Sequence, residues 1–394
     1  MVASTQSEPA LGHRCLEAPA ASTTCRRHEE AEISQHKEPG MEQVRVAVLG
    51  LGFAGYLHYS SYQSLGETAK LVAICDPNEE RLGQHAEISG VEPHTDYRRL
   101  LERKDIDAID ICLPHHLHTD VAVEAAQAGK HILMEKPIAT TVEDADRMIR
   151  AARDANVTLM VAENHLFVPA HRKVKQILDS GVIGKVFLVR AFEGVISELT
   201  LNPNPDDWRN LPHNQGVLLD MGVHKFALLR WLLGDLDSVF AIKDKLVVKD
   251  SAPTYDDTAL ITTKFRSGVV GEIVVTAGVP GGETNALEIY GTDGTILENH
   301  AWTRPVKYMT RKTSPSIGVW VYPAKWHRPK VEHGIFPEYY NISFRNEVKH
   351  FVECVLENKR PDMTGEDGRE ALRASIAAAE SASTGRMVKV RSRA

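Results

Sequence analysis

The chain has 394 residues, of which 43% are hydrophobic and 25% are charged, and its formal net charge is −7 at pH 7. These values are typical of globular proteins, and the length suits two domains, because single cores rarely grow beyond roughly 250 to 300 residues. The negative charge argues against nucleic acid and anionic membrane surfaces as partners, since both are bound largely through Lys and Arg. No apolar run approaches the roughly 20 residues that a bilayer crossing needs, so we expect a soluble protein without a membrane partner.

The cysteines are five in number and are scattered along the chain. They lack the spacing of a zinc site or a redox pair, and an odd number does not suit a disulfide framework. We therefore expect a reducing compartment and a cytoplasmic protein. The five are Cys15, Cys25, Cys75, Cys112 and Cys354.

Residues 1–40 have no hydrophobic periodicity and no apolar core of the kind that a secretory signal contains. Several glutamates also disfavour a mitochondrial presequence, which is poor in acidic residues, among them Glu17, Glu29, Glu30 and Glu32. We expect a disordered N-terminal extension. Met41 stands just before the first strand-like run and is a candidate start of the fold, a hypothesis that an intact-mass measurement on native protein tests.

From Val44 onward, short apolar runs alternate with stretches of helical composition. Continuous apolar strands suit a parallel sheet covered on both faces, and their alternation with helices is the βαβ repetition of a doubly wound fold. We predict an α/β, Rossmann-type domain over residues 41–165. The predicted strands are 44–49, 70–75, 108–113, 131–134 and 158–161, and the predicted helices are 55–65, 79–87, 119–128 and 142–155.

The remainder of the chain is dominated by β-rich segments that alternate in hydrophobicity and are joined by turn residues. Such segments suit a mainly antiparallel sheet with helices on one face. We predict an α+β substrate domain over residues 166–394, with C-terminal helices packing back on the core. The predicted strands are 185–192, 238–248, 258–265, 269–277 and 285–290, and the predicted helices are 170–180, 217–233, 344–358 and 366–384.

A glycine-rich segment, Gly50-Leu-Gly-Phe-Ala-Gly55, follows the first predicted strand and opens the first predicted helix. This is the context that the dinucleotide-binding fingerprint requires. Gly50 permits a tight turn, Gly52 lets the backbone approach a pyrophosphate, and Gly55 lets helix and strand pack closely. The helix N-terminus at Phe53 and Ala54 offers N–H groups to the phosphates. The alternative is a glycine turn without a ligand.

Asp76 stands where the second predicted strand ends, about where the fingerprint places an acidic residue. Its carboxylate would accept hydrogen bonds from the adenosine ribose and repel a 2′-phosphate, which favours NAD over NADP. An alternative role is capping of the following helix, which is common for Asp. Arg81, one turn into that helix, keeps NADP open because its guanidinium could reach a phosphate.

Several further segments, taken in this order, carry a family resemblance. The chain from about Val44 to its end resembles the glucose-fructose oxidoreductase, inositol dehydrogenase and rhizopine-catabolism (Gfo/Idh/MocA) family. The resemblance implies a Rossmann domain with an open-faced second domain, NAD(P)-dependent chemistry on sugars or polyols, and assembly into homodimers or homotetramers. The segments are Leu113-Pro-His-His-Leu-His118, Met134-Glu-Lys-Pro137, Trp208-Arg209, Leu218-Leu-Asp-Met-Gly-Val-His224, 364–368 and 381–385.

Glu135, Lys136 and Pro137 end a predicted strand, at the carboxyl edge where doubly wound sheets bind their ligands. The resemblance implies that Lys136 lies beside the nicotinamide and the reacting hydroxyl, with Glu135 in the same cofactor site. A lysine in that place can donate to the hydroxyl, or to the carbonyl oxygen as it forms. The alternative is a surface lysine after a strand.

Asp220 and His224 are four residues apart on a predicted helix, so both side chains are expected on one face. The carboxylate can hydrogen-bond the imidazole or the substrate hydroxyl, while the imidazole takes the hydroxyl proton as hydride leaves carbon. We predict His224 as the base, with Lys136 and Asp220 orienting the hydroxyl. The alternative is an ordinary polar pair on a solvated face, which the apolar neighbours on this helix disfavour.

The chain departs from the family pattern just before that helix, where the family usually has a run of glycines and this chain keeps only Gly216. Asn214 and Gln215 stand there instead, and we expect them to reach into the pocket and bond a hydroxylated ligand. Trp208 and Arg209 are retained. They are expected to shape this loop for the substrate, or to anchor it without touching a ligand.

Three histidines, His115, His116 and His118, follow the third predicted strand. No cysteine or acidic residue stands at ligand spacing, so no metal is expected. The resemblance implies instead that Pro114 and His118 line the NAD site. His165 follows the last strand of the Rossmann domain and is a candidate substrate-pocket residue, with a buried structural histidine as the alternative.

The segment 302–340 is long, aromatic and basic. Because loops of this length in compact proteins are commonly functional, we expect it to cap the pocket or to enter a subunit interface.

Together these features predict an NAD-dependent dehydrogenase that oxidises a hydroxyl of a sugar, cyclitol or related polyol. One alternative is a redox-neutral glycoside hydrolase or lyase that oxidises a sugar transiently, eliminates a group and reduces it again. Net release of NADH separates this alternative from a dehydrogenase. A second alternative is a non-catalytic NAD(H)-binding sensor, which would tolerate the loss of Lys136, Asp220 and His224.

Overall fold

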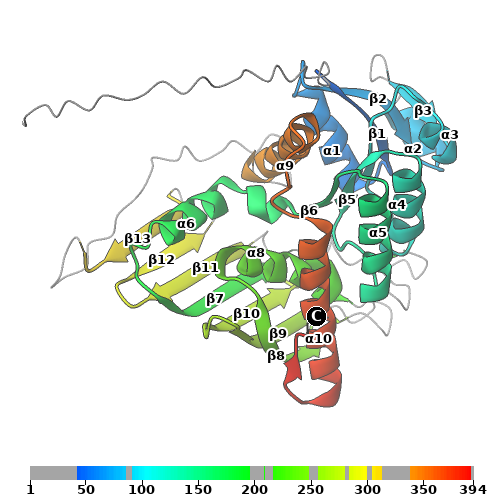
Figure 1. Ribbon diagram of the computed structural model, residues 1–394. Helices are drawn as coiled ribbons and strands as arrows, with labels where there is room; N and C mark the ends of the chain where they lie inside the picture. Colours follow the sequence, from blue (N-terminus) through cyan, green and yellow to red (C-terminus); the bar gives the residue numbers. More distant parts are fainter. Residues whose placement is uncertain are drawn as a thin grey trace, which may run out of the picture. The chain divides into compact units, whose positions relative to one another are not determined.

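Two β-sheets organise the protein in the computed structural model (Figure 1). The first has six strands in the order β3-β2-β1-β4-β5-β6, and the second has eight in the order β13-β12-β11-β7-β10-β9-β8-β14, within the part of the chain that the structure describes. That part comprises residues 42–85, 91–195, 208, 216–247, 256–279, 284–299, 304–312 and 338–391.

The six-stranded sheet, called the parallel sheet below, pairs all its strands in parallel. Its order is that of a doubly wound Rossmann fold, which confirms the predicted fold class. Strand β3 was not predicted, because it has only three residues and they are mostly exposed. The strands are β1 (Val44–Leu49), β2 (Ala69–Cys75), β3 (Glu92–His94), β4 (Ala108–Ile111), β5 (His131–Glu135) and β6 (Leu159–Ala162).

Helices follow the strands of the parallel sheet and cover it. Helix α5 begins where the Thr141 side chain accepts a hydrogen bond from the Asp144 backbone N–H at 3.1 Å, and its apolar side packs against α4. The helices of this half are α1 (Phe53–Gln63), α2 (Glu79–Gln84), α3 (Arg98–Leu101), α4 (His118–Gln127) and α5 (Val142–Asp154).

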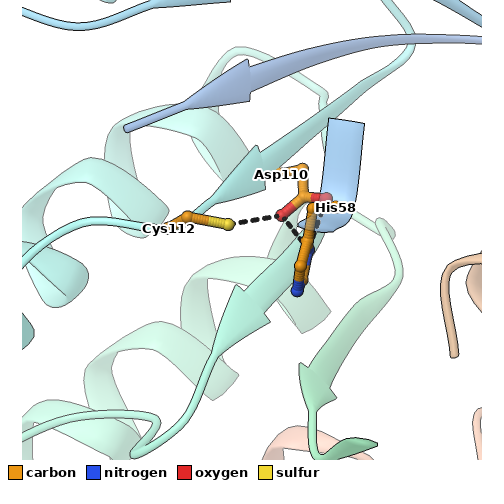
Figure 2. Close-up of side chains that lie close together, drawn as sticks. All are labelled: His58, Asp110 and Cys112. Atoms are coloured by element: carbon orange, nitrogen blue, oxygen red, sulfur yellow. Dashed lines mark hydrogen bonds and ion pairs between the residues drawn. The ribbon is translucent and has the colours of Figure 1, made fainter. Parts of the chain in front are cut away.

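A buried polar cluster lies beneath α1 (Figure 2). The His58 Nδ1 is 2.8 Å from the Asp110 carboxylate on β4, and the Cys112 thiol donates to the same carboxylate at 3.4 Å. On its other side, the His58 Nε2 is 3.3 Å from Glu135 and 3.7 Å from Glu347. Burial disfavours the charged imidazole, but the Asp110 charge more than offsets this and raises the pKa of His58 well above its usual value.

The eight-stranded sheet, called the mixed sheet below, is antiparallel except for one parallel pair, β7 with β10. The mainly antiparallel sheet is therefore as predicted, although β12, β13 and β14 were not foreseen. The strands are β7 (Val186–Gly194), β8 (Leu236–Asp244), β9 (Thr258–Phe265), β10 (Val270–Thr276), β11 (Thr284–Gly291), β12 (Gly294–Asn299), β13 (Val306–Thr310) and β14 (Val388–Lys389).

The described helices of the second half lie on one face of the mixed sheet or bridge to the parallel sheet (Figure 1). Along β9 buried and more exposed residues alternate, as expected for a sheet with one covered face. A single π-helical turn, η4 (Leu218–Gly222), precedes α8, whereas one continuous α-helix was predicted. The helices are α6 (Pro169–Asp179), α8 (Val223–Leu233), α9 (Glu338–Leu356) and α10 (Gly365–Thr384).

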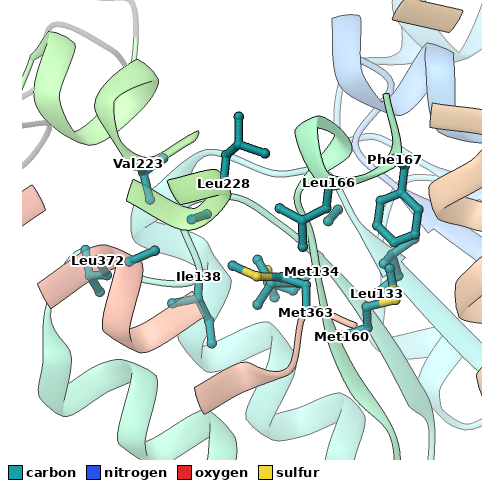
Figure 3. Packing of buried hydrophobic residues seen from close by; sticks show 14 of the residues in the cluster. Leu133, Met134, Ile138, Met160, Leu166, Phe167, Val223, Leu228, Met363 and Leu372 are labelled. Atoms are coloured by element: carbon teal, nitrogen blue, oxygen red, sulfur yellow. The ribbon is translucent and has the colours of Figure 1, made fainter. Parts of the chain in front are cut away.

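A shared apolar core joins the two sheets (Figure 3). Met134 from β5, Leu166 from the 3₁₀ turn after β6, Val223 from α8 and Leu372 from α10 all belong to it and are buried. Fully burying one such side chain stabilises a fold by about 1.5 to 3 kcal/mol. The end of β5 and the start of α8 are thus packed into the same core, which fixes the side chains that follow them.

Among the described residues, no helix combines the length and the apolar character that a membrane crossing requires. Most of the segment 302–340 lies outside the described residues. Strand β13 is the part of it that falls within a described strand of the mixed sheet.

Candidate active site

The glycine loop turns between β1 and α1 in a space that side chains would block. Gly50 has a φ of +87°, and a Cβ built on it would lie 2.3 Å from the Cys112 carbonyl oxygen. A Cβ on Gly55 would lie 1.9 Å from the Gly50 carbonyl oxygen, whereas one on Gly52 would meet nothing within 4 Å. Helix α1 then begins at Phe53 without a side-chain cap. The backbone at Gly52 and the helix N-terminus therefore leave room and N–H donors for a pyrophosphate.

Asp76 lies directly after β2, at the same sheet edge as the glycine loop. Its buried carboxylate accepts hydrogen bonds from the backbone N–H groups of Leu51 and Asn78, each at 2.9 Å, and from the Arg81 guanidinium at 3.0 Å. The side chain that caps α2 is Asn78 and not Asp76, because Asn78 accepts from the Arg81 N–H at 3.0 Å. Asp76 thus holds the glycine loop in place, with Arg81 beside it.

His118 is fully buried at the start of α4. Its Nδ1 is 3.0 Å from the Pro137 carbonyl oxygen and its Nε2 is 2.8 Å from the Leu113 carbonyl oxygen. Burial lowers the pKa of this imidazole. The side chain therefore ties the loop after β4 to the turn after β5, and its place in the NAD site stays a prediction. Pro114, in the same loop, is half-buried.

Lys136 follows β5 and reaches across to the second half of the chain. Its ammonium donates to the Asp220 carbonyl oxygen at 2.6 Å and to the Asp220 carboxylate at 3.0 Å. Burial lowers the pKa of Lys136, but the charges of Asp220 and Glu135 more than offset this, so the pKa is raised. The Glu135 carboxylate also accepts from the Lys136 backbone N–H at 2.9 Å. Lys136 is held as a charged donor.

The imidazole of His224 has a carboxylate partner that the sequence analysis did not assign. Its Nδ1 lies 2.5 Å from Oε1 of Glu163, a fully buried residue that directly follows β6. The ring of His165 stacks on that of His224, with centroids 4.3 Å apart and an interplanar angle of 13°. The sequence analysis had offered Asp220 as a partner either of this imidazole or of the substrate hydroxyl. Asp220 lies in the π turn that precedes α8, whereas His224 lies in α8 itself.

A second buried network lies behind the stacked histidines. The Lys225 ammonium donates to the Asn285 side-chain oxygen at 2.6 Å and lies 3.4 Å from the Glu193 carboxylate. Glu193 in turn lies 3.7 Å from Nε2 of His165. All four side chains are buried, and Glu193 and Asn285 come from strands β7 and β11 of the mixed sheet. None but His165 was singled out from the sequence, since a lysine in a helix and polar residues in two strands give no local signal of this pairing.

Trp208 packs its ring edge-on against that of His115, with centroids 4.6 Å apart. The retained tryptophan therefore contacts the loop after β4. The remaining predicted substrate-loop residues, Arg209, Asn214 and Gln215, lie outside the described residues.

Metal-type side chains gather in two places within the described part of the chain, and neither includes His115, His116 or His118. In both groups the donor atoms lie within 4.8 Å of one another. The groups are His58 with Asp110 and Cys112, and Glu163 with His165 and His224.

Comparison with known proteins places this arrangement in a family. Residues 44–163 match the model described as an oxidoreductase family with an NAD-binding Rossmann fold, and residues 171–297 match the GFO/IDH/MocA C-terminal domain. The chain belongs to the Gfo/Idh/MocA oxidoreductase family. The predicted membership is confirmed, and the protein is an oxidoreductase with an NAD-binding Rossmann unit.

Two curated relatives in the Gfo/Idh/MocA family span almost the same length. The myo-inositol 2-dehydrogenase of Thermotoga maritima is 30% identical over 350 residues, which cover 88% of this chain and 98% of the relative. The scyllo-inositol 2-dehydrogenase (NAD(+)) of Bacillus subtilis is 29% identical over 351 residues, covering 88% and 96%. Among solved structures, a levoglucosan dehydrogenase in complex with NADH and L-sorbose has a TM-score of 0.79 and 26% identity, covering 89% of this chain and 100% of that one.

Proposed function

We propose that this chain is an NAD-dependent dehydrogenase that oxidises a hydroxyl of a sugar, cyclitol or related polyol. The observation that carries the proposal is the 3.0 Å contact between the Lys136 ammonium and the Asp220 carboxylate. It joins the end of β5, at the ligand-binding edge of the parallel sheet, to the helix that bears His224. A charged donor and an imidazole are the two groups that oxidation of an alcohol needs.

The cofactor site we propose is formed at the edge where β1, β2 and β5 end. Gly50, Gly52 and Gly55 shape the loop, while the N-terminus of α1 at Phe53 and Ala54 faces the phosphates. Asp76 accepts from the ribose hydroxyls, and Pro114, Glu135 and Lys136 complete the site. The open space at Gly52 and the absence of a side-chain cap on α1 fit a bound pyrophosphate. When bound, NAD supplies the acceptor for the hydride.

The residues of the protein bind and deprotonate one hydroxyl group of the substrate. Lys136 donates a hydrogen bond to the substrate oxygen and stabilises the negative charge that develops there. Asp220 holds the Lys136 ammonium in place through the contacts described above. His224 takes the hydroxyl proton at its Nε2, since its Nδ1 is engaged by Glu163. In the reverse direction the same imidazole returns the proton.

A polyhydroxylated ligand suits the surroundings of His224. His165 packs on the imidazole, and Trp208, Arg209, Asn214 and Gln215 are proposed to bind the substrate. The relatives named above act on inositols, and the matched solved structure is a levoglucosan dehydrogenase, so cyclic polyols and anhydrosugars are the first substrates to test.

The test is a panel of inositols, aldoses, sugar acids, anhydrosugars and glycosides, with formation of NADH followed by absorbance. A substrate that gives net NADH, with loss of turnover in Lys136→Met, supports the proposal. Product formation without net NADH would assign the redox-neutral hydrolase or lyase reaction instead. NADH binding without turnover of any compound would support the alternative of a non-catalytic NAD(H)-binding sensor. The same panel with NADP tests the preference that we assign to Asp76, with Arg81 as the residue that would bind a 2′-phosphate.

We also propose that the two domains have different functions and that the protein is a homo-oligomer in the cytoplasm. Residues 41–165 bind NAD, and residues 166–394 bind substrate and form a homodimer or homotetramer. The open face of the mixed sheet supports an interface, because Ile242, Leu260, Val274 and Phe192 are register neighbours on it, and Ile242 is 59% exposed. Light scattering on the parent and on Leu260→Lys tests this, with a smaller species expected for the variant.

A further inference from the structure

Two carboxylates lie close to the proposed base, and the structure gives them different partners. Glu163 is paired with the His224 Nδ1 at 2.5 Å, whereas Asp220 is paired with the Lys136 ammonium at 3.0 Å. The two pairs come from different segments, since Glu163 follows β6 and Lys136 follows β5. The two pairs therefore have separate roles. The Glu163–His224 pair accepts the proton, and the Lys136–Asp220 pair binds the hydroxyl oxygen.

Glu163 is buried in a way that makes its pairing with His224 energetically important. Glu163 is fully buried, and its Oε2 has no hydrogen-bond partner among the described residues. The other oxygen, Oε1, receives the His224 contact and a weak hydrogen bond from the His165 backbone N–H at 3.4 Å. Because a buried carboxylate is costly without a donor, the ring N–H at Nδ1 is strongly favoured.

The ring of His224 has little freedom to turn away from this carboxylate. His165 stacks on it at 4.3 Å, and the His165 ring lies in turn beside the Glu193 carboxylate, 3.7 Å from Nε2. One face of the imidazole is thus covered and one ring nitrogen is occupied. The remaining nitrogen, Nε2, is the atom through which the ring can exchange a proton.

We infer that Glu163 is the positioning residue of the base, a role that rests on the proposed dehydrogenase function. It fixes the Nδ1–H tautomer of His224 and stabilises the imidazolium that forms when Nε2 takes the hydroxyl proton. In the oxidation the O–H and C–H bonds of the substrate break and a C=O bond forms. The proton goes to Nε2, the hydride goes to NAD, and Glu163 takes up no proton in this step.

The ring stacking disfavours a metal ion held by Glu163, His165 and His224, although their donor atoms lie within 4.8 Å of one another. The rings of His165 and His224 are nearly parallel, so the in-plane lone pairs of their nitrogens run in parallel planes and do not converge on one ion. A zinc ion needs its ligands arranged tetrahedrally around it. The stacked arrangement instead favours a role of His224 in proton transfer.

The test compares four full-length variants. Glu163→Gln removes the charge and keeps an oxygen acceptor, Glu163→Leu removes both, and Asp220→Asn changes the other carboxylate. Glu347→Gln is the control for a Glu-to-Gln change at an equally buried position, where the carboxyl faces His58 instead of His224. Steady-state kinetics, NADH binding and melting temperature are measured for each, together with ¹⁵N chemical shifts of the His224 ring, assigned by their loss in His224→Asn.

For Glu163→Gln we expect kcat to fall about 10- to 100-fold, with KM and the NADH dissociation constant within about twofold of the parent. Glu163→Leu should shift the His224 ring signals from the Nδ1–H toward the Nε2–H tautomer. Glu347→Gln should leave both kcat and the ring signals unchanged. A kcat within about twofold of the parent in Glu163→Gln, or an unchanged tautomer in Glu163→Leu, overturns the inference.

The ring signals also separate this inference from the proposed function, because they need neither substrate nor turnover. If no compound yields NADH but the tautomer changes in Glu163→Leu, the dehydrogenase proposal fails while the positioning of the ring stands. If turnover is found and the tautomer does not change, the dehydrogenase stands and the role of Glu163 is refuted.

Discussion

The Lys136 ammonium lies 3.0 Å from the carboxylate of Asp220, although 84 positions separate the two residues. Lys136 follows β5 of the parallel sheet, and Asp220 belongs to the π turn that leads into α8. Because β5 and α8 contribute to one apolar core, this contact is held by rigid elements on both sides. Rigid support of this kind places a donor and an acceptor without further ordering when substrate binds.

Replacing Lys136 tests the charged donor directly. Lys136→Met keeps the length and apolar stem of the side chain but removes the ammonium, so we expect kcat/KM to fall about 10²- to 10⁴-fold. NADH binding should be retained within a few-fold, as measured by fluorescence titration. Lys70→Met, an exposed lysine on β2, is the control and should leave both values unchanged. A Lys136→Met enzyme with near-parental kcat/KM would exclude a catalytic role for this lysine.

The glycine loop offers a pair of variants that separate folding from cofactor binding. In Gly55→Ala the new methyl would lie 1.9 Å from the Gly50 carbonyl oxygen, so the backbone must move and the melting temperature should fall by several degrees. In Gly52→Ala the methyl meets nothing within 4 Å, so the fold should melt at the parental temperature.

NADH affinity should nevertheless fall in Gly52→Ala, by about 10-fold or more, because the methyl occupies the space through which a pyrophosphate approaches. Thermal unfolding and calorimetric titration with NADH distinguish the two effects. Equal NADH affinity in Gly52→Ala and the parent would contradict the proposed phosphate site.

Asp76 is expected to contribute to both loop order and cofactor choice. Asp76→Ala removes the acceptor for the Leu51 N–H and for the ribose hydroxyls. A charge-assisted hydrogen bond contributes about 1.5 to 3 kcal/mol, so the NADH dissociation constant should rise about 10- to 100-fold.

The effect of Asp76→Ala on NADPH should be smaller, because the carboxylate no longer repels the 2′-phosphate and Arg81 remains beside it. Calorimetric titration with each nucleotide measures both constants. Asp154→Ala, an exposed aspartate on α5, is the control. An unchanged ratio of the two constants in Asp76→Ala would count against cofactor selection by this residue.

The buried Glu347 predicts a measurable dependence of stability on pH. Burial raises the pKa of this carboxyl well above its usual value of 4.5. Of the facing charges, His58 on α1 lowers the pKa, while Glu135 at the end of β5, Glu163 after β6 and Asp110 on β4 raise it. The folded protein therefore keeps a proton that the unfolded chain releases.

Because the folded protein binds more protons than the unfolded chain, the unfolding free energy falls as pH rises. Stability from Glu347 is fully present below pH 4.5 and is lost as pH rises toward the folded-state pKa, with a slope of at most about 1.4 kcal/mol per pH unit. Glu347→Gln resembles the protonated carboxyl, so its unfolding free energy should fall less steeply between pH 5 and 8, the range over which we propose urea titrations. Glu353→Gln, on the exposed side of α9, should keep the parental slope. Identical slopes in the parent and Glu347→Gln would show that Glu347 is not protonated in the folded state.

Much of the fold could be predicted from local patterns. The apolar runs of the parallel sheet and the glycine loop each depend on neighbours a few residues away, so periodicity and turn chemistry were sufficient to identify them. Strand β3 escaped because three mostly exposed residues carry no such periodicity. His118 was assigned to the cofactor site from its position, but whether a histidine is exposed or fully buried depends on packing that the sequence does not contain.

For the candidate site, too, some features could be predicted from the sequence and others could not. The sequence by itself determined that Lys136 follows a strand and that Asp220 and His224 lie close together in the chain, because both are statements about residues a few positions apart. Only the tertiary structure decided that Lys136 meets Asp220 and that Glu163 meets His224. These pairings depend on which strand ends are neighbours in the sheet and on where the π turn places Asp220, and neither can be read from local sequence.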